Sequence, residues 1–330
     1  MEDLLKDLLE YAISKQASDI HFTCNQKILK IQLRIQNKMI DLYQDIWKPS
    51  FFEYLKFISK MDLTNPFTPQ SGQFKIVILG KLIYCRFSVI FNQNIQTGVL
   101  RILNHASRIE IYNLSLWKSD IDFFKSIIHA RSGLIISCGP TNSGKTTTLH
   151  ALLHEISNLG QHKVVSLEDP IEIEDDFYLQ LQVNESQGFT FEVGIEQLLR
   201  HDPDVICIGE TRNAYTAKMV VRAALTGHLV LTTIHAKNAM ECLSRLENLG
   251  VDKFELSNIV TAIFSQRLYS SKKGKVCVYE ILNQEHVKYI LENSKYPKNV
   301  DTLQDKIKEG IKNGYIQDEQ AKYDLFDFER

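Results

Sequence analysis

The pattern G-x-x-x-x-G-K-[ST] is met at every specified position by Gly139-Pro140-Thr141-Asn142-Ser143-Gly144-Lys145-Thr146. A short apolar run over 134–138 precedes this stretch, and apolar residues at helical spacing follow it over 147–156. A strand, a glycine-rich turn and a helix form the context in which the pattern binds phosphate, and a glycine-rich turn that binds nothing is the alternative. The sequence therefore predicts a nucleotide site.

Each residue type in this loop has a task in holding a phosphate chain. Gly139 and Gly144 let the backbone turn its amides toward phosphate oxygens. A helix that begins at Lys145 adds unpaired N–H groups and a positive dipole end. We expect Lys145 to reach the β- and γ-phosphates and the Thr146 hydroxyl to ligate Mg²⁺. The contacts to the nucleotide are predicted to run from Gly139 through Thr147.

Composition places the chain among ordinary globular proteins. Its 330 residues suggest roughly two domains, and 44% hydrophobic with 24% charged residues is a typical balance. The formal net charge of -2 gives no global basic field for nucleic acid. The acidic, interrupted start is unlike a signal peptide, and no apolar run approaches the roughly 20 residues of a membrane-spanning helix. Six scattered cysteines without a CxxC pair favour a reduced cytoplasmic setting over disulfides or a metal site.

Periodicity divides the chain into two domains and a connecting segment. Residues 1–104 combine helical stripes with alternating runs and predict a small α+β domain. The mixed segment 105–118 is interpreted as a linker. From 119 to 330, helices alternate with short apolar strands, which predicts a doubly wound, mostly parallel α/β sheet. The tail from 283 onward is expected to form two helices.

Two acidic residues follow buried strands of this predicted sheet. Glu168 ends the run 163–167 and Glu210 ends the run 205–209, and open parallel sheets place ligands at such ends. ATP hydrolysis needs one carboxylate beside Mg²⁺ and one that orients and deprotonates water. Glu168 and Glu210 are the candidates, with Asp169 and Glu172 in support. A carboxylate that merely caps the next helix is the alternative for Glu210.

Histidines and arginines have competing interpretations. His228 and His235 bracket the strand 229–234, which favours a phosphate-sensing or coupling role over that of ordinary core residues. Arg86 and Arg101 lie on predicted strands of the first domain. From spacing alone they are solvated charges or weak surface ion pairs.

Several segments together carry a family resemblance. They match the Walker A, Asp box, Walker B and His box of the type II secretion and type IV pilus ATPases, in that family's order. Ala17-Ser18-Asp19-Ile20-His21 resembles the family's N-terminal signature, and Gln266-Arg267-Leu268 resembles a late motif. The four boxes occupy 139–148, 167–172, 198–212 and 226–236.

The resemblance implies a P-loop, RecA-like motor that uses ATP and Mg²⁺. It implies a cytoplasmic homo-hexameric ring at the inner face of the cell membrane, which drives a pilus-like filament through an inner-membrane platform protein and contacts pilin-like subunits indirectly. Glu168 is then implied as the catalytic base, Glu210 as the acidic residue beside Mg²⁺, and His228 with His235 as the His-box pair. The same resemblance implies that Arg86 and Arg101 approach the phosphates.

The chain departs from the family pattern at three places. Gln73 stands where arginine is frequent, and Asn213 replaces an aspartate. The insert with four zinc-binding cysteines is missing between Arg267 and Val276, so no zinc is expected.

Short length, the missing insert and the lack of an extra N-terminal domain resemble the competence pseudopilus ATPases of Gram-positive bacteria. Retraction ATPases are similar in size, but their C-terminal Ala-Ile-Arg-Asn-Leu-Ile stretch is absent. We therefore expect an assembly ATPase for DNA uptake. A retraction motor, or a regulatory nucleotide-binding protein with weak hydrolysis, is the alternative. A DNA-translocating motor in direct contact with nucleic acid is disfavoured, because the sequence has no basic stripe.

Overall fold

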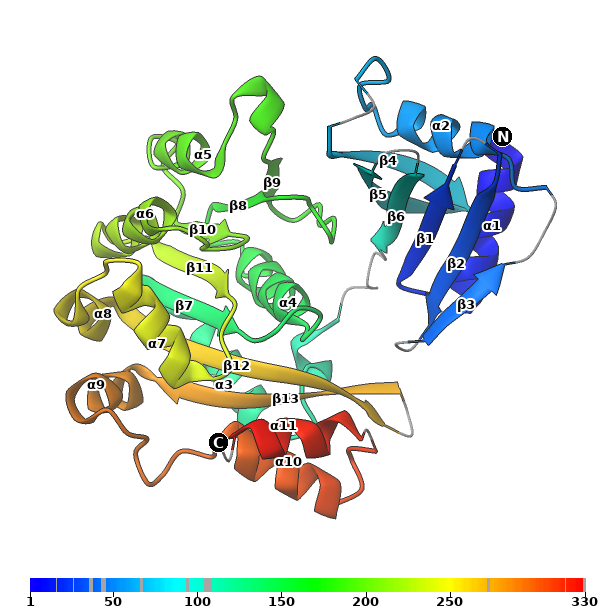
Figure 1. The fold of residues 1–330 in the computed structure, drawn as a ribbon. Coiled ribbons are helices and arrows are strands. Elements are labelled where there is room, and N and C mark those ends of the chain that lie inside the picture. The colour runs from blue at the N-terminus through cyan, green and yellow to red at the C-terminus, as the bar shows by residue number, and fades with distance from the viewer. Residues whose placement is uncertain are drawn as a thin grey trace. The chain divides into compact units, whose positions relative to one another are not determined.

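The computed structural model describes residues 1–15, 17–25, 27–35, 38–42, 46–65, 68–92, 95–103, 109–271, 274–317 and 319–328. The chain forms two compact units, Met1–His105 and Ala106–Arg330 (Figure 1). Residues 105–108 of the expected linker lie outside the described residues. The rest of that segment is packed into the second unit, because Ile111 and Leu114 are buried in its core.

The first unit is an antiparallel sheet with two helices. Its six strands follow the order β3-β2-β1-β6-β5-β4. The elements are α1 (Glu2–Ser14), β1 (Asp19–Cys24), β2 (Leu29–Ile35), β3 (Lys38–Leu42), α2 (Pro49–Ile58), β4 (Gln70–Ile78), β5 (Lys81–Asn92) and β6 (Ile95–Leu103).

Alternation along these strands sends apolar side chains to the helices and polar ones to the other face. Ile20 and Phe22 of β1 are buried in one cluster with Leu9 of α1 and Phe52 of α2. Such alternation is the pattern of an antiparallel sheet covered on one side.

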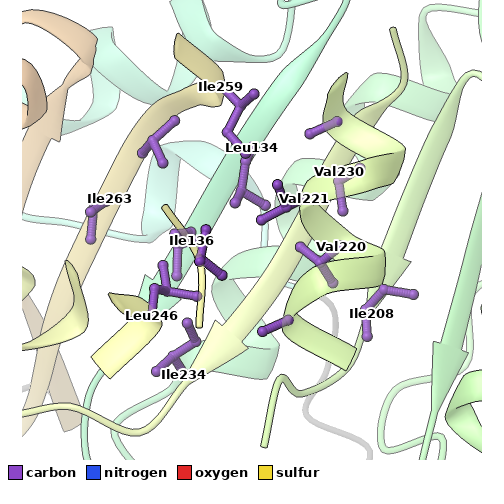
Figure 2. Packing of buried hydrophobic residues seen from close by; sticks show 14 of the residues in the cluster. Leu134, Ile136, Ile208, Val220, Val221, Val230, Ile234, Leu246, Ile259 and Ile263 are labelled. Atoms are coloured by element: carbon purple, nitrogen blue, oxygen red, sulfur yellow. The ribbon is translucent and has the colours of Figure 1, made fainter. Parts of the chain in front are cut away.

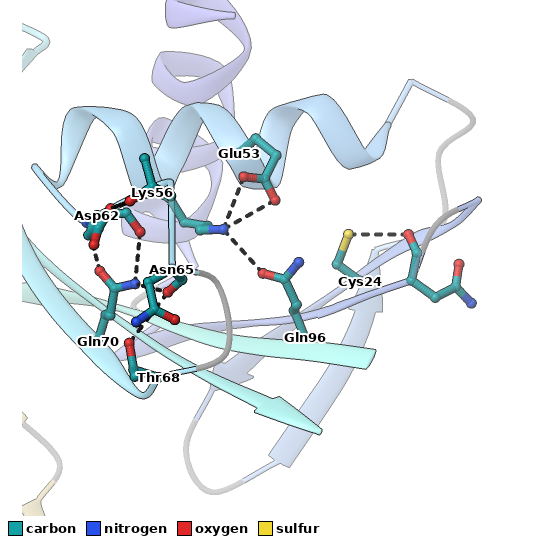
Figure 3. Close-up of polar contacts among 10 residues, drawn as sticks. Cys24, Glu53, Lys56, Asp62, Asn65, Thr68, Gln70 and Gln96 are labelled. Carbon is teal, nitrogen blue, oxygen red and sulfur yellow. Dashed lines mark hydrogen bonds and ion pairs between the residues drawn. The ribbon is translucent and has the colours of Figure 1, made fainter. Parts of the chain in front are cut away.

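Polar contacts fix α2 and the segment after it to this sheet (Figure 3). The buried Lys56 ammonium lies 3.0 Å from Glu53 Oε2 and donates to Gln96 Oε1 at 3.3 Å. Gln70 Nε2 donates to the backbone oxygens of Asp62 at 2.9 Å and of Asn65 at 3.0 Å.

The second unit is built on a seven-stranded sheet in the order β13-β12-β7-β11-β10-β8-β9. Every neighbouring pair is parallel except β12 with β13. The predicted mostly parallel α/β fold is confirmed. Its strands are β7 (Gly133–Cys138), β8 (Val164–Glu168), β9 (Leu179–Gln182), β10 (Val205–Ile208), β11 (Leu229–Ile234), β12 (Val260–Ser271) and β13 (Gly274–Asn283).

Helices cover both faces of this sheet, so its strands are apolar on both sides. Val220 and Val221 of α6 pack against Leu134 and Ile136 of β7 on one face (Figure 2), while Ile135 joins the core of the other face. The helices are α3 (Lys118–Ile127), α4 (Lys145–Asn158), α5 (Phe191–Leu198), α6 (Ala214–Leu225), α7 (Ala239–Asn248), α8 (Lys253–Ile259), α9 (Gln284–Asn293), α10 (Leu303–Lys312) and α11 (Gln320–Phe328), with 3-10 turns η1 (Ile111–Asn113) and η2 (Glu185–Gln187).

The tail forms three helices, not the expected two. Helix α9 ends where Ser294 adopts a left-handed conformation, with φ of 54°. The next helix, α10, begins at a capping box in which Thr302 and Asp305 bond reciprocally. Leu303 and Ile307 of α10 pack with Tyr269 of β12. None of the helices in the described ranges is long and apolar enough to cross a membrane.

Candidate active site

The loop between β7 and α4 has a backbone that its glycines make possible. The φ angles of Gly139 and Gly144 are +155° and +91°, values that side chains with a Cβ rarely adopt. A Cβ on Gly139 would lie 2.5 Å from Ser143 Oγ and 2.6 Å from the Gln266 carbonyl oxygen. The loop is therefore closed tightly at its base.

Lys145 is folded into this loop. Its side chain is buried, and Nζ donates to the carbonyl oxygens of Gly139 at 3.0 Å and Pro140 at 2.8 Å. Burial lowers the pKa of Lys145, against the opposing charges of Glu210 and Glu172 among others. The ammonium is held by carbonyl oxygens where the sequence predicts phosphate.

Two features of the loop fit a phosphate ligand. The Ser143 hydroxyl is buried and has no hydrogen-bond partner among the residues that the structure describes. Helix α4 begins after Gly144 without a side-chain cap, so the first N–H groups have no intrahelical acceptor. A phosphate group would satisfy such donors.

Glu168 lies inside the protein at the end of β8, with 4% of its surface exposed. Its Oε1 accepts from Ser166 Oγ at 2.6 Å and from Gln180 Nε2 at 3.1 Å, while Oε2 lies 3.1 Å from His150 Nε2. Both oxygens are therefore engaged by the protein. This arrangement suits a structural carboxylate, which fixes neighbouring side chains. It suits a general base less well, because a base needs an oxygen that is open to water.

Glu172 is placed differently from Glu168. Its side chain is exposed, and its charge acts on the pKa of Lys145. Sequence reasoning gave Glu172 only a supporting role. The signal that was available is its position in the same acidic segment, four residues after Glu168.

Glu210 follows β10 at the edge of the sheet that carries the loop 139–147. Its carboxylate lies 2.8 Å from Arg212 Nη2 and 3.4 Å from His235 Nε2, and its charge acts on Lys145. The helix after Glu210 is capped by Asn213, whose Oδ1 accepts from Thr216 N at 2.8 Å. Asparagine and aspartate cap a helix equally well, so the substitution keeps the cap and leaves the Glu210 carboxylate for other partners.

The two histidines of the His box lie at opposite ends of one strand. His235 follows β11 on the edge that carries the loop. His228 precedes β11, where its carbonyl accepts from Gly133 N at the start of β7. A strand of six residues spans roughly 20 Å. His228 therefore lies about a strand length from the loop within this unit, with its Nδ1 3.1 Å from the Ala223 carbonyl oxygen, and its phosphate-sensing or coupling role stays a prediction.

Gln266 joins β7 to the loop 139–147 by hydrogen bonds, a role that could not be read from the sequence. It is fully buried on β12, accepts from Ser137 Oγ at 2.8 Å and donates to the Ser143 carbonyl at 2.9 Å. The neighbouring Arg267 donates to the Lys237 carbonyl at 2.7 Å, two residues after His235. The signal was the late Gln-Arg-Leu motif, whose contacts could not be derived from sequence.

Two of the three arginines of the first unit, Arg86 and Arg101, lie side by side on its polar face. Arg86 and Arg101 are directly opposite in the β5–β6 register. Arg101 Nε donates to Asp19 Oδ1 at 2.8 Å, and Arg86 Nε donates to Ser71 Oγ at 3.2 Å. Gln73 is the partner of Arg86 on the other side. The arginines thus form one cluster, and their approach to phosphate stays a prediction.

Comparison with known proteins gives the family. The model of the type II/IV secretion system protein family matches residues 1–312. The competence protein ComGA of Bacillus subtilis is 32% identical over 340 residues, which cover 96% of this chain and 95% of the relative. The chain belongs to the type II/IV secretion system protein family. Members of this family are ATPases.

Further relatives agree with this assignment. The type II secretion system ATPase E of Vibrio cholerae is 34% identical over 268 residues, which cover 80% of this chain and 53% of the relative. The chain thus spans about half the length of that protein. Among solved structures, the pilus retraction motor PilT has a TM-score of 0.74 at 26% identity, covering 97% of this chain and 96% of PilT. The ATPase DotB of Legionella pneumophila, at 19% identity and a TM-score of 0.78 over 98% of this chain and 95% of DotB, shows the same fold.

Among the residues that the structure describes, no group of three or more histidines, cysteines or acidic residues could hold a metal ion. A magnesium ion bound chiefly through phosphate needs no such group. The expected absence of zinc stays a prediction.

Proposed function

We propose that this chain hydrolyses ATP at the loop 139–147 and uses the energy to assemble a pilus-like filament of the competence type. The observation that carries the proposal is the closed loop around the buried Lys145. The similarity to the competence protein ComGA over nearly the full length of both chains supports the filament that is named.

The residues around the loop divide the chemistry among them. Lys145 would exchange its carbonyl partners for phosphate oxygens. Thr146 and Glu210 would hold Mg²⁺, which supplies neutralising charge on the phosphates when it is bound. Glu172 is exposed, its charge acts on Lys145, and it would orient and deprotonate water. Glu168, with both oxygens engaged, would hold the segment that carries Glu172. This exchanges the roles that the family resemblance implied for the two glutamates.

The larger assembly is part of the proposal. A homo-hexamer at the inner face of the membrane would act on a platform protein, with pilin-like subunits moved indirectly and no direct contact to nucleic acid. Arg86 and Arg101 are cationic groups outside the motor unit, as expected if arginines are brought to the phosphates only in the working ring.

Steady-state turnover tests the enzymatic part. Glu172→Gln is expected to reduce kcat by about 100-fold or more, the range typical for a lost catalytic base. Lys145→Ala is expected to reduce kcat by about 100-fold or more as well, because a cation that stabilises charge on the phosphates is lost. Glu168→Gln keeps the shape of the side chain, so we expect a smaller loss together with a lower melting temperature. Wild type no faster than Lys145→Ala would favour a regulatory nucleotide-binding protein. Loss in Glu168→Gln with full activity in Glu172→Gln would restore the original assignment.

A retraction motor is the second candidate, favoured by the similarity to PilT. Surface filaments separate the two in cells that express Lys145→Ala as the sole copy. An assembly motor predicts loss of filaments, whereas excess filaments would indicate retraction. Co-purification with the membrane platform protein, and mass determination with and without a non-hydrolysable ATP analogue, test the partner and the ring.

A further inference from the structure

Helix α4 carries two buried histidines one turn apart, and each contacts a carboxylate. His150 Nε2 lies 3.1 Å from Glu168 Oε2, and His154 Nδ1 lies 2.6 Å from Asp175 Oδ2. Residues four apart share one face of a helix, so both rings face the chain that follows β8. The two residues are 5% and 1% exposed, respectively. Burying an imidazole or a carboxylate costs free energy unless the group is paired. These contacts are therefore needed for this face of α4 to pack as it does.

Second partners fix the direction of these hydrogen bonds. The Tyr178 hydroxyl contacts His150 Nδ1. The ionised Glu168 carboxylate can only accept, so Nε2–H of His150 donates to it, and in the neutral imidazole Nδ1 then accepts from the Tyr178 hydroxyl. Asn158 Nδ2 lies 3.0 Å from His154 Nε2 and donates to it, which leaves Nδ1–H of His154 as the donor to its carboxylate.

Two of these partners, Asp175 and Tyr178, belong to one segment, residues 169–178, which directly follows Glu168. Gln180 of β9 ties the same segment from the other side, because its Oε1 accepts from Asp175 N at 2.8 Å and its Nε2 donates to the Ile173 carbonyl at 2.8 Å. Ile173 is buried and directly follows Glu172. The exposed Glu172 therefore projects from a segment whose backbone is fixed at the next residue.

We propose that His150 and His154 are positioning residues that lock the segment 169–178 onto α4 and thereby hold Glu172 at a set place relative to Lys145. The inference rests on the proposed function, in which Glu172 activates water. Lys145 is the first residue of α4. The same helix therefore fixes the position of the phosphate-binding Lys145 and, through His150 and His154, that of the proposed base Glu172. A misplacement of about 1 Å in such a pair can cost about 100-fold in rate.

A double-mutant cycle tests this link. His154→Ala is expected to lower kcat at least about tenfold while the dissociation constant of a fluorescent ATP analogue changes less than about twofold. In a Glu172→Gln background, the same change is expected to lower kcat no further, because a positioning residue acts only through the group it positions. His154→Asn, which keeps a donor near the place of Nδ1, should recover much of the rate. His129→Ala, at an exposed histidine of the same unit, is the matched control and should leave kcat unchanged.

We call the contacts of His150 and His154 that hold the segment 169–178 the clamp. The outcomes separate the clamp from the proposed function. An equal loss from His154→Ala in both backgrounds, or no rescue by His154→Asn, overturns the clamp and leaves the role of Glu172 standing. Full turnover in Glu172→Gln alone overturns the role of Glu172. If His154→Ala does not fold, Tyr178→Phe removes only the hydroxyl that orients His150, and it should lower kcat with unchanged nucleotide affinity. Unchanged kcat in Tyr178→Phe would count against the clamp.

Discussion

At the scale of single residues, the site is governed by charges that shift one another. His235 lies 3.4 Å from Glu210, yet its pKa is lowered, because burial and the nearby Lys145 outweigh that carboxylate. A neutral imidazole therefore faces the loop at physiological pH. It can accept or donate one hydrogen bond at the site without adding a second cation beside Lys145.

The lowered pKa of His235 predicts a specific acid sensitivity. Above about pH 6.5 the imidazole is neutral in the folded and unfolded chain and adds no penalty. As the pH falls through 6.5 the unfolded chain binds the proton first, so stability is lost until the pH is below the lowered pKa of the folded state. Between about pH 7.5 and 5.5 the melting temperature of wild type should therefore fall more than that of His235→Gln. Parallel falls would contradict the prediction, and His201→Gln, at an exposed histidine, is the control.

At the scale of elements, parallel strands bring the ends of β7, β8, β10 and β11 to one edge of the sheet. This part could be predicted, because apolar runs ending in glycine or an acidic residue mark where each strand stops. The hydrogen bonds of Glu168 could not be predicted, because its partners lie on α4 and β9 as well as on β8. The separation of His228 and His235 follows from the six-residue strand between them, whereas the role of His228 stays a prediction.

The support beneath the loop can be tested by removing its amide. Gln266→Leu leaves the Ser137 hydroxyl and the Ser143 carbonyl without their buried partner, at a cost of about 1–3 kcal/mol for each group left unpaired. We expect a lower free energy of unfolding in urea and weaker ATP binding. Gln161→Leu, at an exposed glutamine, should change neither. Equal unfolding free energies for the two variants would show that the amide does not support the loop.

At the scale of the whole molecule, the chain separates a motor unit from a unit that carries two adjacent arginines. Arg101 pairs with the buried Asp19, while Arg86 Nε donates to the uncharged Ser71 hydroxyl. Arg101 therefore contributes more than Arg86 to the stability of its own unit. Removing Arg86 disturbs the fold less, so a change in turnover can be assigned to catalysis.

Substituting the two arginines separates structure from catalysis. Arg101→Ala leaves Asp19 without its cation and should destabilise the first unit by about 1–2 kcal/mol, below the 3–5 kcal/mol of a fully buried pair, because Arg101 is 53% exposed. Arg86→Ala should leave the melting temperature near that of wild type and lower ATP turnover at least about tenfold if it meets the phosphates. Wild-type turnover in Arg86→Ala would remove Arg86 from the site.

The account as a whole depends on a triphosphate bound by the loop around Lys145. Calorimetric titration of the purified chain with a non-hydrolysable ATP analogue and Mg²⁺ tests this directly, beside Lys145→Ala. We predict saturable binding to wild type and affinity reduced at least about tenfold in the variant, because a charge-assisted contact to phosphate is lost. Absence of binding to wild type, or equal affinity in Lys145→Ala, would contradict the account.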